Sequence, residues 1–228
     1  LETSLHQQLK LHYAPDVSQT EVVVGRFRID AVRNDELIEI QCASLSAIKS
    51  KIQTLLKRHQ VRVVKPIVLR TRIAKKKTSR SRVSSRRMSP KRGDVLDLFD
   101  DLIYFTRVFP HDGLTLELAL VHVEQTRVPG KRRRRRWQKD FSVQDVSLET
   151  IESTIELTTA ADLCDLVGID RRADSFTTED IAALTQRPRW FALKIAYVLR
   201  ETHAIESIGR KRTGIVYRAA TRGSRRAA

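Results

Sequence analysis

Asp30 and Glu39 are acidic residues at a spacing that suits the binding of a divalent cation. Each lies in an apolar run that predicts a β-strand, and the runs flank Asn34-Asp35, a pair suited to a two-residue hairpin turn. With that turn, Asp30 lies directly across from Glu39, and their Cβ atoms are about 5 Å apart. Two carboxylates this close repel each other unless a positive charge lies between them.

The face of this hairpin decides which side chains could share a bound ion. Alternation along the strand puts Gln41 on the same face as Glu39, and Ile38 and Ile40 on the opposite face. A hard divalent cation, Mg²⁺ or Mn²⁺, would satisfy two facing carboxylates. The alternative is a hairpin whose polar face is simply solvated.

The flanking segments predict the elements that hold this hairpin. Residues 1–13 indicate a short amphipathic helix that carries Glu2, and residues 46–58 indicate a second helix with an apolar stripe and a basic side. A third apolar run, at residues 61–69, predicts another strand. The predicted order is therefore helix, strand, strand, helix, strand.

This order, with an acid pair on the hairpin, resembles the core of the PD-(D/E)XK, or restriction-endonuclease-like, nuclease superfamily. The resemblance covers about residues 1–70 and implies an α/β (α+β) core, a mixed sheet flanked by helices. It implies that Asp30, Glu39 and Gln41 are the catalytic motif, and that Glu2 matches the acid many members carry on their first helix. It also implies that Asp30, Glu39 and the Ile40 carbonyl hold Mg²⁺ or Mn²⁺ beside the scissile phosphate.

Gln41 departs from the family pattern, in which this position is usually Lys. A glutamine is neither a cation nor a general base. Activation of water would then depend on the metal and Glu39, or on a basic residue from elsewhere in the chain.

The charge of the chain independently favours a nucleic-acid partner. Lys and Arg number 43 against 27 Asp and Glu, a net charge of +16 with a pI of about 10.4. No acid occurs between residues 61 and 92, and we expect residues 70–93 to be a basic insertion. A second basic block spans residues 131–136. Solvated tails or sorting signals are the alternative for such runs. The DNA contacts expected here are Lys91, Arg92, Arg132, Arg133 and Arg134.

A change in composition near residue 145 predicts a domain boundary. Before it, residues 94–108 predict a helix and residues 114–123 a strand that extends the first sheet. After it, residues 145–182 hold ten acids and only two bases. We therefore expect a nuclease-like domain at residues 1–145 and a second domain at residues 146–228.

The second domain has its own pattern of helices and strands. Thr177 starts a helix as its N-cap, with Asp180 completing a capping box, and a longer helix follows at residues 188–203. Two short strands, 205–209 and 214–218, then enclose a basic turn. This order resembles the winged-helix family of DNA-binding domains, although such domains also dock proteins. The resemblance implies DNA contacts from the second helix and the wing, with Trp190 either among them or in the core: Arg187, Arg189, Lys194, Arg210, Lys211 and Arg212.

Cysteine usage and hydropathy bear on the compartment. Cys42 and Cys164 form neither a zinc pattern nor a disulfide framework, which favours a reducing cytoplasm. No apolar run approaches the roughly 18 residues that span a bilayer, so we expect no membrane partner, and no signal peptide is visible from Leu1 onward. A DNA-bound protein would be associated with the nucleoid.

The sequence thus predicts a Mg²⁺-dependent DNA endonuclease that a winged helix holds on duplex DNA rather than RNA. Cutting both strands would need two sites, hence a homodimer, unless the enzyme only nicks. One alternative is an inactive nuclease-like DNA-binding regulator or architectural protein. Another is a ribosomal or RNA-associated basic protein, which fits the charge but explains neither the paired acids nor the winged-helix pattern.

Overall fold

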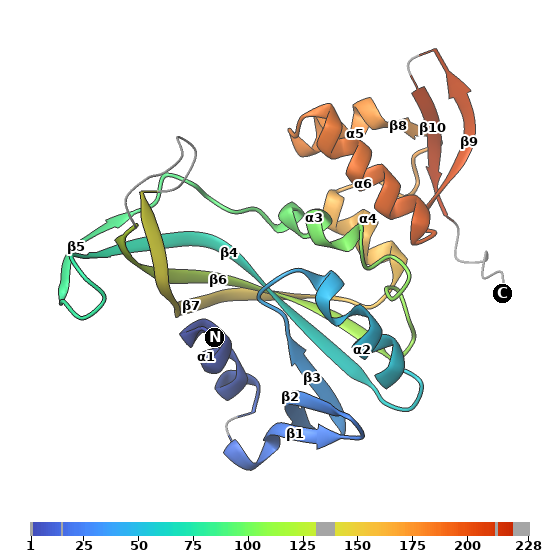
Figure 1. Cartoon of the computed structure of the whole chain (residues 1–228). Helices are drawn as coiled ribbons and strands as arrows, with labels where there is room; N and C mark the ends of the chain where they lie inside the picture. The colour runs from blue at the N-terminus through green and yellow to red at the C-terminus, as the bar shows by residue number, and fades with distance from the viewer. Residues whose placement is uncertain (1, 15, 131–139, 213, 221–228) are drawn as a thin grey trace. The chain divides into compact units, whose positions relative to one another are not determined.

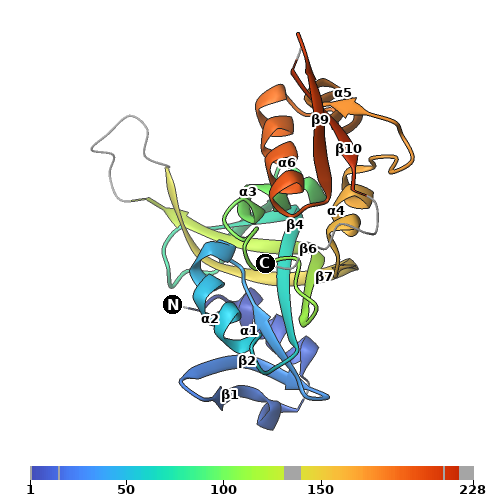
Figure 2. The same cartoon turned by 90° about the vertical axis from the view of Figure 1, so that its right-hand side faces the viewer.

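The computed structural model describes residues 2–14, 16–130, 140–212 and 214–220, and it is a mixed α/β fold (Figures 1 and 2). The chain divides into two compact units. The first contains Leu1–Cys42, Arg62–Val95 and Glu117–Ile155, and the second contains Ala43–Val61, Leu96–Leu116 and Glu156–Ala228. The predicted boundary at residue 145 was wrong in one respect, because it falls inside a continuous strand, Phe141–Leu157.

The larger sheet has seven strands in the order β1-β2-β3-β4-β6-β7, with β5 paired to β4. Helix α1 (Ser4–Tyr13) and the short 3-10 helix η1 (Val17–Gln19) precede it along the chain. The strands are β1 (Thr20–Val24), β2 (Phe27–Arg33), β3 (Glu36–Ile40), β4 (Val61–Lys76), β5 (Val83–Met88), β6 (Leu114–Pro129) and β7 (Phe141–Leu157).

The predicted β2–β3 hairpin is confirmed, including its register. Ala31 pairs with Ile38 and Arg33 with Glu36. The turn residues Asn34 and Asp35 both have positive φ, 50° and 64°, as a type I′ turn requires. The pairing ends at Ala31 and Ile38, one position before Asp30 and Glu39, the two predicted acids.

Helix α1 packs on one face of the sheet through residues spaced four apart. Leu5, Leu9 and Tyr13 are buried against Ala31 of β2, Ile38 and Ile40 of β3, and residues of β4 and β6. The helix lacks a side-chain cap of its own at Thr3. Instead Asp145 of β7 accepts hydrogen bonds from the backbone N–H of Ser4 (3.0 Å) and from its hydroxyl (2.5 Å). The start of α1 is therefore held by a residue distant in sequence.

Within the basic tract at residues 70–93, strands β4 and β5 pair. Strand β4 continues to Lys76, and β5 returns antiparallel to it with Arg72 opposite Met88 and Lys75 opposite Ser85. Ile73 and Ala74 are buried despite their basic neighbours. Burial of Ile73 and Ala74 and the pairing of β4 with β5 thus stabilise strands in a segment whose charge pattern did not indicate them.

The second unit holds the remaining helices and a three-stranded sheet. Its helices are η2 (Leu45–Ile48), α2 (Lys49–Leu55), η3 (Val95–Leu98), α3 (Phe99–Leu102), α4 (Ala160–Val167), α5 (Thr178–Thr185) and α6 (Arg189–Glu201). Its strands are β8 (Phe176–Thr177), β9 (Ile205–Lys211) and β10 (Gly214–Ala219), in the order β8-β10-β9.

Two predicted helices are shorter than expected, and one predicted cap is confirmed. Residues 94–108 form only η3 and α3, after which turns with i to i+3 hydrogen bonds keep Phe105 and Val108 buried. The helix predicted at 46–58 is split into η2 and α2. Thr177 caps α5, with the predicted capping box to Asp180.

We predict that Leu9→Ala lowers the free energy of unfolding by about 3 kcal/mol, because Leu9 is fully buried between α1 and the sheet. Leu11 is on the same helix but 51% exposed, and Leu11→Ala should change stability by less than about 0.5 kcal/mol. Urea unfolding of both variants measures the difference. Equal decreases in stability would show that α1 does not depend on this packing.

Candidate functional site

The candidate site lies where α1 meets β2 and the end of β3. Asp30 is partly buried, and its Oδ2 accepts a hydrogen bond from the backbone N–H of Ile40 at 2.8 Å. Glu39 is 7% exposed. The Asp30 carboxylate is thus fixed against the backbone of the strand that carries the other two motif residues.

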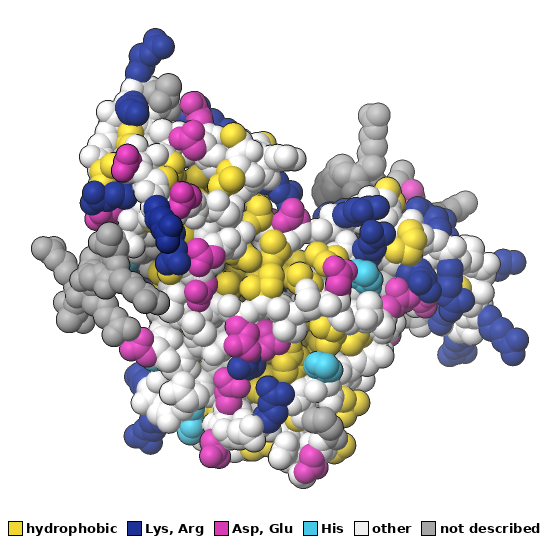
Figure 3. Space-filling view, turned by 180° about the vertical axis from the view of Figure 1, so that it is seen from behind, with side chains coloured by type: hydrophobic (Ala, Val, Ile, Leu, Met, Phe, Trp, Pro, Cys, Tyr) yellow, Lys and Arg dark blue, Asp and Glu magenta, His cyan; other side chains and the backbone are white. Residues whose placement is uncertain are grey.

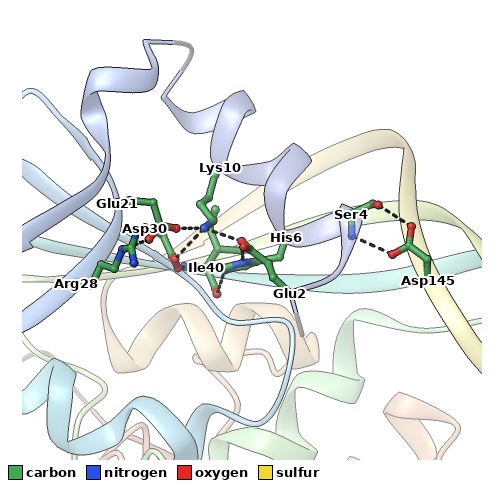
Figure 4. Close-up of polar contacts among 9 residues, drawn as sticks. All are labelled: Glu2, Ser4, His6, Lys10, Glu21, Arg28, Asp30, Ile40 and Asp145. Carbon is green, nitrogen blue, oxygen red and sulfur yellow. Dashed lines mark hydrogen bonds and ion pairs between the residues drawn. The ribbon is translucent and has the colours of Figure 1, made fainter.

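Three side chains from the start of the chain converge on Asp30 (Figure 4). Glu2 lies just before α1, and His6 and Lys10 follow at helical spacing, so all three lie on one side. The Nδ1 of His6 is 2.5 Å from Glu2, and its Nε2 is 3.2 Å from Asp30 and 3.0 Å from the Ile40 carbonyl oxygen. His6 therefore connects the acid predicted on the first helix with the acid predicted on the hairpin.

Lys10 provides the positive charge between the carboxylates. Its side chain is 8% exposed, and its Nζ is 2.6 Å from Glu2 and 3.8 Å from Asp30. It also forms an ion pair with Glu21, which in turn pairs with Arg28. The repulsion expected among neighbouring acids is thus relieved by a residue of the chain itself.

The pKa values of this cluster follow from its contacts. Burial opposes ionisation of Asp30, but the hydrogen bonds from His6 and from the Ile40 N–H outweigh it and lower its pKa. The hydrogen bond to Asp30 raises the pKa of His6, against the effect of burial. Desolvation opposes protonation of Lys10, yet Glu2 and Glu21 leave its pKa raised. Each of the three shifts favours the charged form of its group.

Lys65 of β4 is a basic residue that the sequence analysis missed. Strands β3 and β4 are neighbours, and the N–H of Gln41 donates to the carbonyl of Val64 at 2.9 Å. Val64 packs with Ile38 and Ile40 on the α1 face, so alternation puts Lys65 on the other face, with Glu39 and Gln41.

Lys65 is as deeply buried as one of the predicted acids, Glu39. Lys65 and Glu39 are each 7% exposed. The charges of Lys65, Asp30 and Glu2 all act on the Cys42 thiol. A lysine between Val64 and the apolar run at residues 66–69 was the available signal.

The predicted metal ligands are chemically suitable but engaged. Carboxylates of Asp30 and Glu39 and the carbonyl of Ile40 are hard oxygen donors of the kind Mg²⁺ prefers. In the part of the chain that the structure describes, no group of three or more His, Cys, Asp or Glu side chains is arranged to hold a metal ion. The oxygens of Asp30 and Ile40 contact His6, and Lys10 lies beside Asp30.

The other predicted DNA contacts belong to other elements of the chain. Lys91 and Arg92 are exposed after β5, and Arg210, Lys211 and Arg212 are exposed in the β9–β10 hairpin. Arg132, Arg133 and Arg134 lie outside the described residues.

On α6 and just before it, two of the predicted cations are offset by acidic residues of the same unit. Arg187 pairs with Asp97 at 3.2 Å, and Lys194 pairs with Asp100. Trp190 is 64% exposed and is not a core anchor.

Comparison with known proteins places the chain in a family. The family model described as "Domain of unknown function (DUF8091)" matches residues 3–158, and the chain belongs to this family. An "Uncharacterized protein" of Treponema pallidum (strain Nichols) is 28% identical over 182 residues, which are 79% of this chain and 71% of that protein. No solved structure matches the chain. No helix among the described residues has the length and apolar character to cross a membrane.

We predict that His6→Gln raises the pKa of the Asp30 carboxyl, because the variant removes the charged partner that favours the carboxylate. Carboxyl ¹³C NMR titration measures it. His12→Gln, an exposed position on the same helix, is the matched control and should leave Asp30 unchanged. An Asp30 pKa that is the same in wild type and His6→Gln would contradict the assigned contact.

The His6–Asp30 pair should make the stability of the fold depend on pH in a direction that the two pKa shifts determine. Because the pKa of His6 is raised in the folded protein, His6 contributes fully to the free energy of unfolding below pH 6.5, its ordinary pKa. This contribution is lost as the pH rises through the pKa that His6 has in the folded protein. Because the pKa of Asp30 is lowered in the folded protein, Asp30 contributes to the free energy of unfolding above pH 3.8, its ordinary pKa. This contribution is lost as the pH falls through the pKa that Asp30 has in the folded protein. The destabilisation caused by His6→Gln should therefore be larger at mildly acidic than at alkaline pH.

Proposed function

We propose that this DUF8091 chain is a metal-dependent DNA endonuclease with a restriction-endonuclease-like core. The convergence of Glu2, His6 and Lys10 on Asp30 carries the proposal. Sequence resemblance alone assigned Glu2 and Asp30 to one site, and the two residues share His6 and Lys10 as partners. Part-buried clusters of charged groups with shifted pKa values are typical of catalytic sites.

The order of elements supports the same assignment. Helix α1 is followed by the β2–β3 hairpin, α2 and β4, the order of the nuclease core, with the short strand β1 added before the hairpin. Asp30 and Glu39 stand on the two strands of the hairpin, as the family motif requires.

We assign Asp30, Glu39 and the Ile40 carbonyl as the ligands of Mg²⁺ or Mn²⁺. Such an ion lowers the pKa of water and offsets negative charge on a phosphate under attack. Lys10 and His6 keep Asp30 ionised and hold its carboxylate against Ile40, so the chain presents a charged oxygen donor there at neutral pH.

Two lysines compensate for the glutamine at position 41. Gln41 orients water or a phosphate oxygen through its amide and carries no charge. Lys65 shares the sheet face of Glu39 and Gln41, and its ammonium group supplies positive charge toward a phosphate. Lys10 supplies it from the side of α1.

DNA is the proposed substrate, and residues of the second unit are its proposed anchor. The net charge of +16 favours a polyanion. The order α4, α5, α6 and the β9–β10 hairpin is that of a winged helix, with Arg210, Lys211 and Arg212 exposed in the wing. Because Asp97 and Asp100 offset Arg187 and Lys194, the wing is the stronger of the two DNA contacts.

A non-catalytic DNA-binding protein is the second candidate, and one observation favours it. Lys10 already neutralises the carboxylates that would otherwise attract a cation. A fold that no longer cleaves DNA could keep this arrangement for stability alone.

We predict that the full chain cleaves supercoiled plasmid with Mg²⁺ or Mn²⁺ and not with EDTA, and that Asp30→Asn and Glu39→Gln each lower the rate by about 100-fold or more. Asp35→Asn is the matched control, since it removes the same charge from the exposed turn of the same hairpin. Gel electrophoresis of nicked and linear products measures the rate. Retained DNA binding without cleavage would favour the second candidate, and equal cleavage by every variant would show that the site is elsewhere.

We also predict that the triple change Arg210→Gln, Lys211→Gln and Arg212→Gln flattens the salt dependence of DNA binding, by up to about 0.9 in slope for each phosphate that the variant no longer neutralises. Fluorescence anisotropy with a labelled duplex measures it. Arg171→Gln with Arg172→Gln, exposed in the same unit, gives the effect of reduced charge alone. An unchanged slope in the wing variant would exclude the wing as a DNA contact.

A further inference from the structure

The end of the larger sheet that carries β5 is strongly basic. We define the basic arm as Arg72–Met88: the last part of β4, the turn at residues 77–82, and β5. Lys and Arg side chains gather over this part of the molecule (Figure 3). Its cations are Arg72, Lys75, Lys76, Lys77, Arg80, Arg82, Arg86 and Arg87, and no acid lies between residues 61 and 92.

The basic arm is a built structure rather than a loose tail. In its turn, Thr78 and Ser81 exchange hydrogen bonds of 2.9 to 3.2 Å, and the side chain of Gln144 in β7 donates to the Ser79 carbonyl at 3.1 Å. At its base, the N–H of Ser89 donates to the carbonyl of Thr71 at 2.8 Å. The cations are thus presented on ordered backbone, which lowers the entropy lost when a ligand binds.

Gly93 holds the chain that leaves the basic arm. Its N–H donates to the Leu69 carbonyl at 3.1 Å. A Cβ at this position would lie 2.0 Å from the Val68 carbonyl oxygen, so only glycine permits this approach. Lys91 and Arg92 are therefore kept beside β4 and extend the row of cations.

Most of these charges are not offset by carboxylates. Within the described residues, Arg72 pairs with Glu149 and Arg86 with Glu124, both partly exposed contacts. Lys75, Lys77, Arg80, Arg82 and Arg87 are exposed and have no ion pair among the described residues.

The cations also crowd one another where β6 passes the arm. Burial and the nearby charge of Arg87 lower the pKa of Arg127, whose guanidinium lies 3.8 Å from the centre of the Phe141 ring. Like charges held this close favour an anion between them.

We propose that the basic arm binds duplex DNA along its backbone, with the exposed Lys and Arg side chains of the turn and β5 on successive phosphates. These side chains lie at one edge of the larger sheet, because β4 has β6 as well as β5 for a neighbour. B-form DNA and A-form RNA present their phosphates across grooves of different width, so an ordered row of cations can distinguish the two duplexes. Backbone contacts of this kind carry no base sequence, so the arm holds any sequence beside the site. The proposal deepens the proposed function by specifying how its substrate is held.

Binding is tested on the full chain in EDTA, so that cleavage is not a readout. The arm variant carries Lys77→Gln, Arg80→Gln and Arg82→Gln. The control variant carries Arg26→Gln, Lys57→Gln and Arg58→Gln, three exposed cations outside the arm that remove the same charge. The probe is a labelled 30-base-pair DNA duplex of random sequence, followed by anisotropy over a range of salt, with unlabelled DNA and RNA duplexes of the same sequence as competitors.

The slope of log affinity against log salt should fall by about 2.7 in the arm variant, about 0.9 for each phosphate that it no longer neutralises, and by much less in the control variant. Unlabelled RNA duplex should compete far less well than DNA. Equal decreases in both variants would overturn the proposal in favour of net charge, and equal competition by RNA would overturn the assignment of duplex DNA as the ligand. Because nothing here depends on hydrolysis, a chain that binds in this way without cleaving plasmid would contradict only the proposed function.

Discussion

The packing of α1 on the face of the larger sheet is the constraint on which the candidate site depends. Leu5, Leu9 and Tyr13 bury one side of the helix against Ala31, Ile38 and Ile40. That burial fixes the rotation of the helix, so His6 and Lys10 on the adjoining side reach Asp30 of the hairpin. Asp145 holds the first turn through Ser4, and the Tyr13 hydroxyl donates to Glu117 near the last turn. The helix is thus fixed at both ends and along its length, which leaves the polar cluster little freedom to rearrange.

The cluster combines groups that stabilise the fold with groups suited to chemistry. Lys10 and His6 keep Asp30 ionised, as a donor for a hard cation requires, but they also satisfy it in the absence of one. Under the proposed function, Gln41 stands where the nuclease superfamily usually has a lysine, and Lys10 and Lys65 supply the positive charge instead. Lys65 is buried on the sheet face of Glu39 and Gln41, so its charge carries a desolvation cost.

The two units offer different kinds of surface to a partner. In the second unit, the exposed side of α6 carries Trp190, Leu193 and Tyr197, and acidic residues offset two of its cations, so its character is more aromatic than basic. In the first unit, the basic arm presents exposed cations on ordered strands. A polyanion is attracted mainly to the latter surface and to the wing, since electrostatic attraction depends on charge that is not already paired.

Local pattern was sufficient for part of this protein. Asn34-Asp35 specified the β2–β3 turn and its register, and Thr177 with Asp180 specified the start of α5, because turns and caps depend on neighbouring residues. The strands of the basic arm escaped prediction, since their pairing and the burial of Ile73 and Ala74 depend on other strands. Contacts between distant segments were decided by the tertiary structure alone. Asp145 binds the start of α1, Lys10 lies among Glu2, Glu21 and Asp30, and β4, which carries Lys65, lies beside β3. In the second unit, Asp97 pairs with Arg187 and Asp100 with Lys194. The sequence by itself determined which residues could do chemistry, but the charge that each one meets depends on neighbours that only folding brings together.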